Sequence, residues 1–169
     1  MYGDPEAIRR LARQAGGWAD EMRADASRSA QAAETKWQSV RAGRYRTQLA
    51  EAVEHARGAA RELDELSAAL DAHADAVERR LAQIAAAERW LRRQIADAWD
   101  VARRGLEMVE GLADDVGDFL GLGDDDSDKA RAEANAAQAR AKQLSGQVDG
   151  VPNGDLRWLD MARAHGWSG

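Results

Sequence analysis

The residues that could support catalysis or metal binding are few, and their spacing does not assemble a site. His55, His73 and His165 lie far apart in the sequence, whereas a zinc site needs three or four converging donors. The sequence contains no Gly-x-Ser-x-Gly motif, no P-loop and no dinucleotide-binding glycine motif. We therefore expect no enzymatic activity, metal or cofactor, and we expect His73 to be packed or to face a partner.

One acidic segment begins like a calcium-binding loop. Asp124, Asp126 and Asp128 have the spacing of its first three ligands, but Lys129 replaces the required glycine and Asn135 replaces the bidentate glutamate. We interpret residues 121–128 as a solvated acidic Gly/Asp linker.

Basic and aromatic residues alternate in a second segment, a combination that can bind nucleic acid or an anionic membrane surface. They are Arg89, Trp90, Arg92, Arg93, Trp99, Arg103 and Arg104, and an acidic block from Glu107 to Asp118 follows directly. Ion pairing between antiparallel helices or subunits is the simpler interpretation. The net charge of -6 also argues against nucleic-acid binding, and we do not expect membrane contact.

The composition predicts an all-α protein. Of the residues, 44% are hydrophobic but only 5% aromatic, and 32% are charged. Alanine, leucine, arginine and glutamate favour helices, and β-branched residues are scarce. This balance is typical of long helices that have one narrow apolar stripe and a wide solvated face.

The periodicity predicts two long N-terminal helices. Asp4 and Pro5 provide an N-cap and a first helical residue for a helix over about 5–34. Its apolar stripe contains Ile8, Leu11, Ala15, Trp18 and Met22. Residues 35–43 are predicted to form a turn, and a second helix then runs from 43 to about 119.

The second helix carries a heptad repeat, which is typical of a coiled coil. Leu49, Ala56, Leu63, Leu70, Val77, Ile84 and Leu91 recur every seven residues. The register then shifts by four, a stutter that unwinds a coil locally without ending the helix. Another series runs from Ile95 to Leu120, and either a later helix or a partner chain must cover it.

We therefore divide the chain into a long antiparallel helical hairpin with an extended second helix (1–120), the acidic linker (121–128) and C-terminal helices with a tail (129–169). The C-terminal part is predicted to hold a helix at about 128–147 with a seam of small residues, and a short helix near 155–165. The seam residues are Ala130, Ala134, Ala137, Ala141, Leu144 and Val148.

The first half of the chain resembles the WXG family of type VII secretion substrates and the related signal domains of actinobacterial secreted toxins. The resemblance covers residues 3–90. It rests on Gly-Asp-Pro-Glu-Ala-Ile at 3–8, Trp18-Ala19-Asp20, Trp37-Gln38-Ser39, Tyr45-Arg46, and Leu63, Leu66, Leu70, His73 and Val77.

This resemblance implies a hairpin that pairs with a second hairpin into a four-helix bundle and is exported folded by a membrane-bound ATPase. Trp37 and Ser39 become the candidate export signal, with Ser39 in the place of the family's glycine. The Tyr-x-x-x-Asp/Glu motif that normally follows the second helix is absent after helix two. The absence indicates either a heterodimer, in which a partner chain supplies the motif, or a relative that is not secreted.

The leading hypothesis is a secreted protein, without a cleavable signal peptide, that acts by helix–helix binding as a homo- or heterodimer. Its predicted partner-binding seam is Leu63, Leu66, Leu70, Val77, Leu81 and Ile84. Two alternatives stay open: a cytoplasmic coiled-coil scaffold or adaptor, and a peripheral membrane protein that uses Trp90, Trp99 and the nearby arginines.

Overall fold

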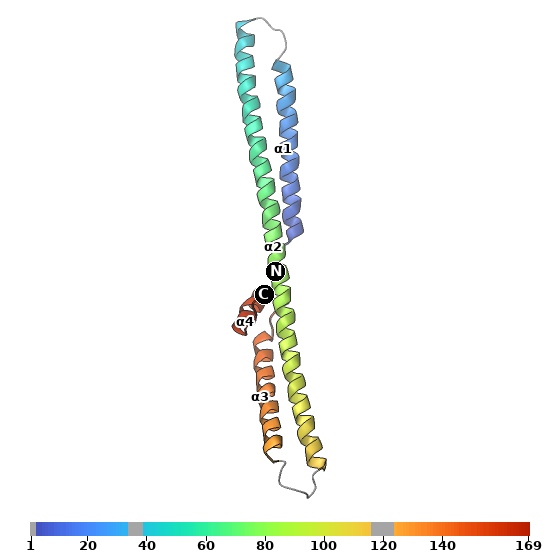
Figure 1. Ribbon diagram of the computed structural model, residues 1–169. Helices are drawn as coiled ribbons and strands as arrows, with labels where there is room; N and C mark the ends of the chain where they lie inside the picture. The colour runs from blue at the N-terminus through green and yellow to red at the C-terminus, as the bar shows by residue number, and fades with distance from the viewer. Residues whose placement is uncertain (1–2, 34–38, 116–123) are drawn as a thin grey trace. The chain divides into compact units, whose positions relative to one another are not determined.

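The computed structural model is all-helical in the residues that it describes, namely 3–33, 39–115 and 124–169, which confirms the predicted fold class. The four helices are α1 (Pro5–Ala33), α2 (Val40–Asp115), α3 (Asp124–Val148) and α4 (Arg157–Ala164) (Figure 1). Within the described ranges, no helix is long and apolar enough to cross a membrane.

Side-chain caps fix the starts of the two long helices. The Asp4 carboxylate accepts a hydrogen bond from the backbone N–H of Glu6 at 3.0 Å, as the sequence predicted. The Ser39 hydroxyl accepts one from the backbone N–H of Ala42 at 3.1 Å, so α2 begins at Val40 rather than at 43. The predicted turn over 35–43 is therefore too long at its C-terminal end.

The chain forms two compact units, and the boundary between them falls inside α2, at Arg79 and Arg80. Residues 3–79 contain α1 and the first part of α2, which lie side by side (Figure 1). Their contacts run in opposite chain directions, because Arg9 pairs with Asp75 and Arg23 pairs with Asp64.

The other unit contains the later part of α2 together with α3 and α4. Here α3 packs against the later part of α2, where Ala102 of the second apolar series is buried but Trp99 and Leu106 are 39% and 41% exposed. From residue 109 on, the side chains of this series lie outside the described ones. The buried residues of α3 are Ala134, Ala141 and Leu144, all members of the predicted small-residue seam. The helix α2 is unbroken past Leu91, as expected of a stutter.

The largest fully buried side chain among the described residues is Trp158 of α4. Trp158 is 1% exposed and packs with Leu159 and Ala162 of α4 against Ile84, Ala87 and Leu91 of α2. The Trp158 indole N–H donates a hydrogen bond to the Pro152 carbonyl at 2.8 Å. Residues 149–169 are therefore a folded cap on α2 rather than a tail.

The acidic segment differs from its prediction as well. The structure begins α3 at Asp124, so residues 124–128 are helical rather than a linker. Acidic residues in a first helical turn interact favourably with the positive end of the helix dipole, which explains why this segment can extend the helix.

Candidate helix-binding surface

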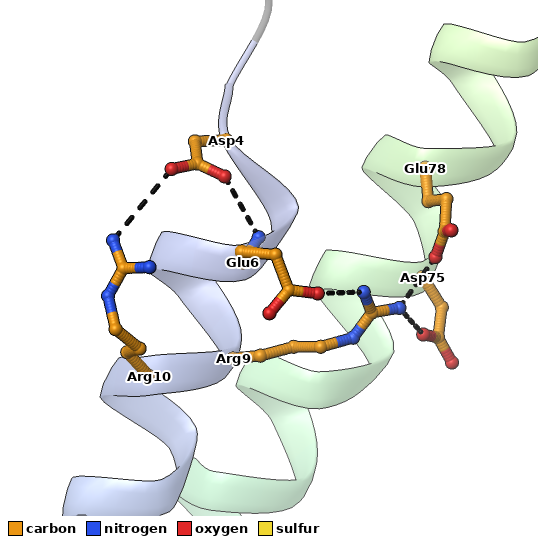
Figure 2. Close-up of polar contacts among 6 residues, drawn as sticks. All are labelled: Asp4, Glu6, Arg9, Arg10, Asp75 and Glu78. Atoms are coloured by element: carbon orange, nitrogen blue, oxygen red, sulfur yellow. Dashed lines mark hydrogen bonds and ion pairs between the residues drawn. The ribbon is translucent and has the colours of Figure 1, made fainter.

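Ion pairs connect α1 and α2 along one side of the pair. We call this side the charged flank (Arg9, Arg23, Asp64, Asp75 and Glu78). Figure 2 shows the Arg9 guanidinium between the two helices, 2.8 Å from Asp75 and 2.6 Å from Glu78. These hydrogen bonds, together with one to Glu6, raise the pKa of Arg9 above its ordinary value. Arg23 pairs with Asp64, which precedes Asp75 by eleven residues, or about three helical turns of α2.

The face of α1 that lies against α2 is made of alanines. Ala12, Ala15, Ala19 and Ala26 are buried, and the Ser67 hydroxyl of α2 donates a hydrogen bond to the Ala12 carbonyl at 2.8 Å. A hydroxyl reaches the backbone of a neighbouring helix only when the two helices pack closely. The small side chains of α1 permit that approach.

The buried face of α1 differs from the apolar stripe that the sequence predicted. We expected Leu11, Trp18 and Met22 to belong to the buried stripe, but they are 54%, 56% and 38% exposed. Ala15 is the member of that stripe that is fully buried. The larger apolar side chains of α1 therefore form an exposed row beside the alanine face.

The exposed row and the charged flank lie on opposite sides of the pair. At about 100° per residue, Arg9 and Arg23 fall on one side of the alanine face of α1, and Leu11, Trp18 and Met22 fall on the other. On the part of α2 in this unit, the buried positions are Ala42, Val53, Ala60, Ala74 and Val77. Asp64 and Glu78 follow this face on one side, and Leu63, Leu66 and Leu70 follow it on the other.

Because the charged residues of the two helices meet, the apolar rows must also share a side. We call this side the apolar flank (Leu11, Trp18, Met22, Leu63, Leu66 and Leu70). Leu66 is 49% exposed, and Leu63 and Leu70 are partly buried. Exposed apolar patches of this kind, bordered by polar residues, are typical of interaction surfaces.

The predicted partner-binding seam is divided by the structure. Leu63, Leu66 and Leu70 lie on the apolar flank, whereas Val77 is buried in its own unit, where a Cβ on Gly3 would lie 3.7 Å from it. Leu81 is partly buried, and Ile84 is fully buried in the core beneath α4. Ile84 and Val77 are thus used by intramolecular packing, which corrects the prediction that the whole seam is exposed.

The candidate export signal is only partly within the described residues. Trp37 lies outside them. Ser39 is described, and its hydroxyl is the N-cap of α2. Ser39 therefore has a structural role, because it satisfies a backbone N–H that the first turn of a helix leaves without a partner.

The basic segment of α2 is engaged locally rather than across helices. Among the described side chains, Arg92 pairs with Glu88, and Arg103 pairs with Asp100 and Glu107, all within α2. Within the described ranges, these arginines therefore form no ion pair with another helix, and pairing between subunits stays a prediction. The Arg92 guanidinium also lies 5.3 Å from the centre of the Trp158 ring and donates to Asn153.

The tryptophans proposed for membrane contact differ in exposure. Trp90 is partly buried and packs against the core beneath α4, while Trp99 is 39% exposed. Trp90 and Arg92 therefore contact the folded cap formed by residues 149–169.

The buried face of α1 could have been found in the sequence. Alanines at 12, 15, 19 and 26 have helical spacing, and Arg9 and Arg23 repeat at fourteen residues beside them. The predicted stripe followed the residues Ile8, Leu11, Ala15, Trp18 and Met22, which also have helical spacing. The complementary acidic residues on α2 were the clue that the alanine face packs inward.

Comparison with known proteins adds no assignment. The chain has no significant match to a protein-family model, to a curated protein or to a solved structure.

Proposed function

We propose that this chain is a non-enzymatic interaction protein that binds a helical partner through the apolar flank. The observation that carries the proposal is the exposure of Leu11, Trp18, Met22 and Leu66 on one side of two packed helices. An amphipathic helix that lays its apolar face against such a row would bury these side chains, which is a recurring mode of peptide recognition.

The opposite flank favours this choice of surface. Arg9 already holds two carboxylates of α2 and one of α1, so its donors are engaged within the chain. A partner at the charged flank would have to compete with these ion pairs. At the apolar flank, a partner removes apolar surface from water without breaking an ion pair, and this is favourable.

We further propose that the α1–α2 pair is a coiled-coil-like hairpin of the WXG type and that the protein is exported folded by a type VII secretion ATPase. The support is the sequence resemblance over residues 3–90, together with the heptad repeat of α2. In this proposal Trp37 belongs to the export signal, and the partner supplies the tyrosine motif that this chain lacks after its second helix.

The test is export from a bacterial host that has a type VII system, with and without its ATPase, and with candidate partners co-expressed. We expect ATPase-dependent appearance in the medium, and its loss in Trp37→Ala and in the flank variant Trp18→Ser/Leu66→Ser. The matched control is Trp99→Ser, which removes an exposed tryptophan of the other unit.

Two results would contradict the proposal in different ways. Retention of the wild-type chain under every condition would leave the cytoplasmic scaffold as the better explanation. Export of the flank variant at the wild-type level would show that docking at the apolar flank is not needed for secretion.

A further inference from the structure

A groove lies between α2 and α3, in the unit that does not contain the apolar flank. It has a volume of about 350 Å³ and is bordered by residues 94–101 of α2 and 136–140 of α3. Beyond the groove, Gly105 of α2 lies against Ala134 of α3. Residues that come later in α2 therefore face residues that come earlier in α3, and the two helices are antiparallel. We call this space the α2–α3 groove.

The surface of the α2–α3 groove is apolar. Alanines are buried where the two helices touch, namely Ala102, Ala134 and Ala141. Ala98 and Ala137 are partly buried beside them, and such short side chains leave the space next to the contact unfilled. Val101 and, one heptad further along α2, Met108 are 45% and 59% exposed. Because heptad spacing returns to the same side of a helix, these two residues form an apolar edge along the groove.

Opposite charges face each other across the α2–α3 groove. Asp97 of α2 and Arg140 of α3 both line it, and both are exposed. Within the ranges that the structure describes, neither takes part in an ion pair or a side-chain hydrogen bond. Both charges are therefore available to a molecule that occupies the space between them.

A second set of charges follows at heptad spacing, in the reverse order. Arg104 comes seven residues after Asp97, and Glu133 comes seven residues before Arg140. In antiparallel helices these two residues lie at the next level on the same side. Both are exposed, and neither has an ion pair in the part of the chain that the structure describes. The α2 wall thus carries an acid and then a base, and the α3 wall carries a base and then an acid.

We propose that the α2–α3 groove binds an amphipathic helix of a second protein. The partner helix presents large apolar side chains at heptad spacing to Val101 and Met108, a recurring mode of helix recognition. On its side toward α2 it carries a basic and then an acidic residue, and on its side toward α3 an acidic and then a basic residue. This surface is separate from the apolar flank, so the inference goes beyond the proposed function.

A helix suits the α2–α3 groove better than a small ligand does. Sites for small molecules use a few polar groups that converge in a buried pocket. In the described part of the chain, no polar or charged residue is buried. The charges of the groove are instead exposed and repeat every seven residues, which is the spacing of the charged residues that flank the apolar stripe of a packed helix.

The probe is a pair of synthetic peptides about two heptads long, with leucine at the apolar positions. A side-chain cross-link holds them helical, because free helices of this length are marginal in water. The matched peptide carries lysine and glutamate in the proposed order, and the reversed peptide exchanges every lysine with a glutamate at the same net charge. The proposed pattern is unchanged when the helix is turned end for end, so its direction in the groove does not affect the comparison.

Fluorescence anisotropy with the full chain measures both affinities. We expect the matched peptide to bind at least about tenfold more tightly, because the reversed peptide meets a like charge at each of the four positions. A peptide of two heptads that shifts by one heptad loses half of its contacts, so a shift does not rescue the reversed peptide. No detectable binding of either peptide, or equal affinities, would overturn the inference.

The decisive variant reverses all four charges of the groove and leaves the net charge unchanged. Its substitutions are Asp97→Arg, Arg104→Glu, Glu133→Arg and Arg140→Asp. It should prefer the reversed peptide by a similar factor. Because it keeps opposite charges on the two walls, any pairing between the walls is retained, and circular dichroism should show unchanged helix content. A variant that still prefers the matched peptide would show that the peptide binds elsewhere.

A steric variant tests the groove itself. Ala136→Trp should fill it and weaken the matched peptide about tenfold or more. The control is Asn135→Trp, about 140° around α3 from Arg140, which should keep the affinity within about twofold of the wild type. The flank variant Trp18→Ser/Leu66→Ser should also bind the peptide like the wild type. Failure of the peptide to bind leaves the apolar flank untouched, because the test of that surface is the export of the flank variant.

Discussion

Gly105 lies so close to Ala134 that a Cβ built on the glycine would be 2.7 Å from the alanine Cβ. The Ala130 carbonyl is also near, at 3.4 Å from the same point. A glycine in the interior of a helix is normally destabilising. The structure gives Gly105 a specific role, because a residue without a Cβ lets α3 pack directly against α2.

The first prediction concerns this contact. Gly105→Ala should lower the free energy of unfolding by about 1–3 kcal/mol, since the added methyl group overpacks the contact with α3. Gly146→Ala is the control, because a Cβ at Gly146 meets nothing within 4 Å. It should raise stability by about 0.5–1 kcal/mol, as expected when alanine replaces glycine in a helix. Urea denaturation followed by circular dichroism measures both, and equal effects would contradict the assigned role.

Ser39 provides a second prediction. Ser39→Ala should destabilise the start of α2 by about 1 kcal/mol, because the backbone N–H of Ala42 loses its hydroxyl acceptor. Ser39→Gly should lower the stability by only a few tenths of about 1 kcal/mol, since glycine is tolerated at an N-cap. Amide hydrogen exchange over residues 40–43 is the appropriate measurement. Unchanged protection in Ser39→Ala would show that the cap is not needed.

Trp158 provides a third prediction. Trp158→Ala should destabilise the unit that contains α3 and α4 by about 3–5 kcal/mol, because it leaves a large cavity among Ile84, Ala87 and Leu91. Trp158→Phe should cost less, since it keeps an aromatic ring but removes the donor to the Pro152 carbonyl. Trp99→Ala, at an exposed position in the same unit, is the control. Similar stability losses in Trp158→Ala and Trp99→Ala would refute the burial of Trp158.

The fourth prediction is a pH dependence at the start of α4. Hydrogen bonds from the side chain and backbone of Arg157 hold the pKa of Asp155 below its ordinary value. A carboxyl whose pKa is lowered by folding stabilises the fold above its unfolded pKa, near 3.9, and loses this contribution as the pH falls through the folded pKa. The protection of α4 amides should therefore decline below about pH 4.

Asp155→Asn isolates this effect from the other carboxylates. The variant should show weaker α4 protection at pH 6 and a flatter profile between pH 6 and pH 3 than the wild type. Asp160→Asn, in the first turn of the same helix, is the comparison and should keep the wild-type profile. Identical profiles for Asp155→Asn and the wild type would show that the Asp155 contacts do not stabilise α4.

Local sequence features predict much of the architecture. They do not decide which of two competing faces of a helix is buried. Composition and periodicity predicted the helices, and the Asp4 cap and the small-residue seam of α3 lie where they were expected. The buried face of α1 was predicted incorrectly, because alanines and larger apolar residues both have helical spacing. Which row packs inward depends on the acidic residues of a helix more than forty positions away.

The C-terminal cap shows the same limit. The sequence predicted a short helix near 155–165, but its periodicity did not indicate that Trp158 is buried in the core. Its burial depends on the turn at Pro152, whose carbonyl accepts the indole N–H, and on Arg92 from α2. Periodicity within one short helix does not contain these tertiary contacts.

The most direct test of the account is the accessibility of the apolar flank in cells that produce the protein. The sequence contains no cysteine, so a single cysteine can be placed by Leu11→Cys on the flank or by Arg13→Cys on the opposite side of the same helix. A membrane-permeant maleimide is then applied to intact cells and, for reference, to the dilute purified chain. The account predicts that cysteine 11 is protected only in cells and that cysteine 13 reacts equally in both; equal labelling of cysteine 11 in both would contradict a docking surface on the apolar flank.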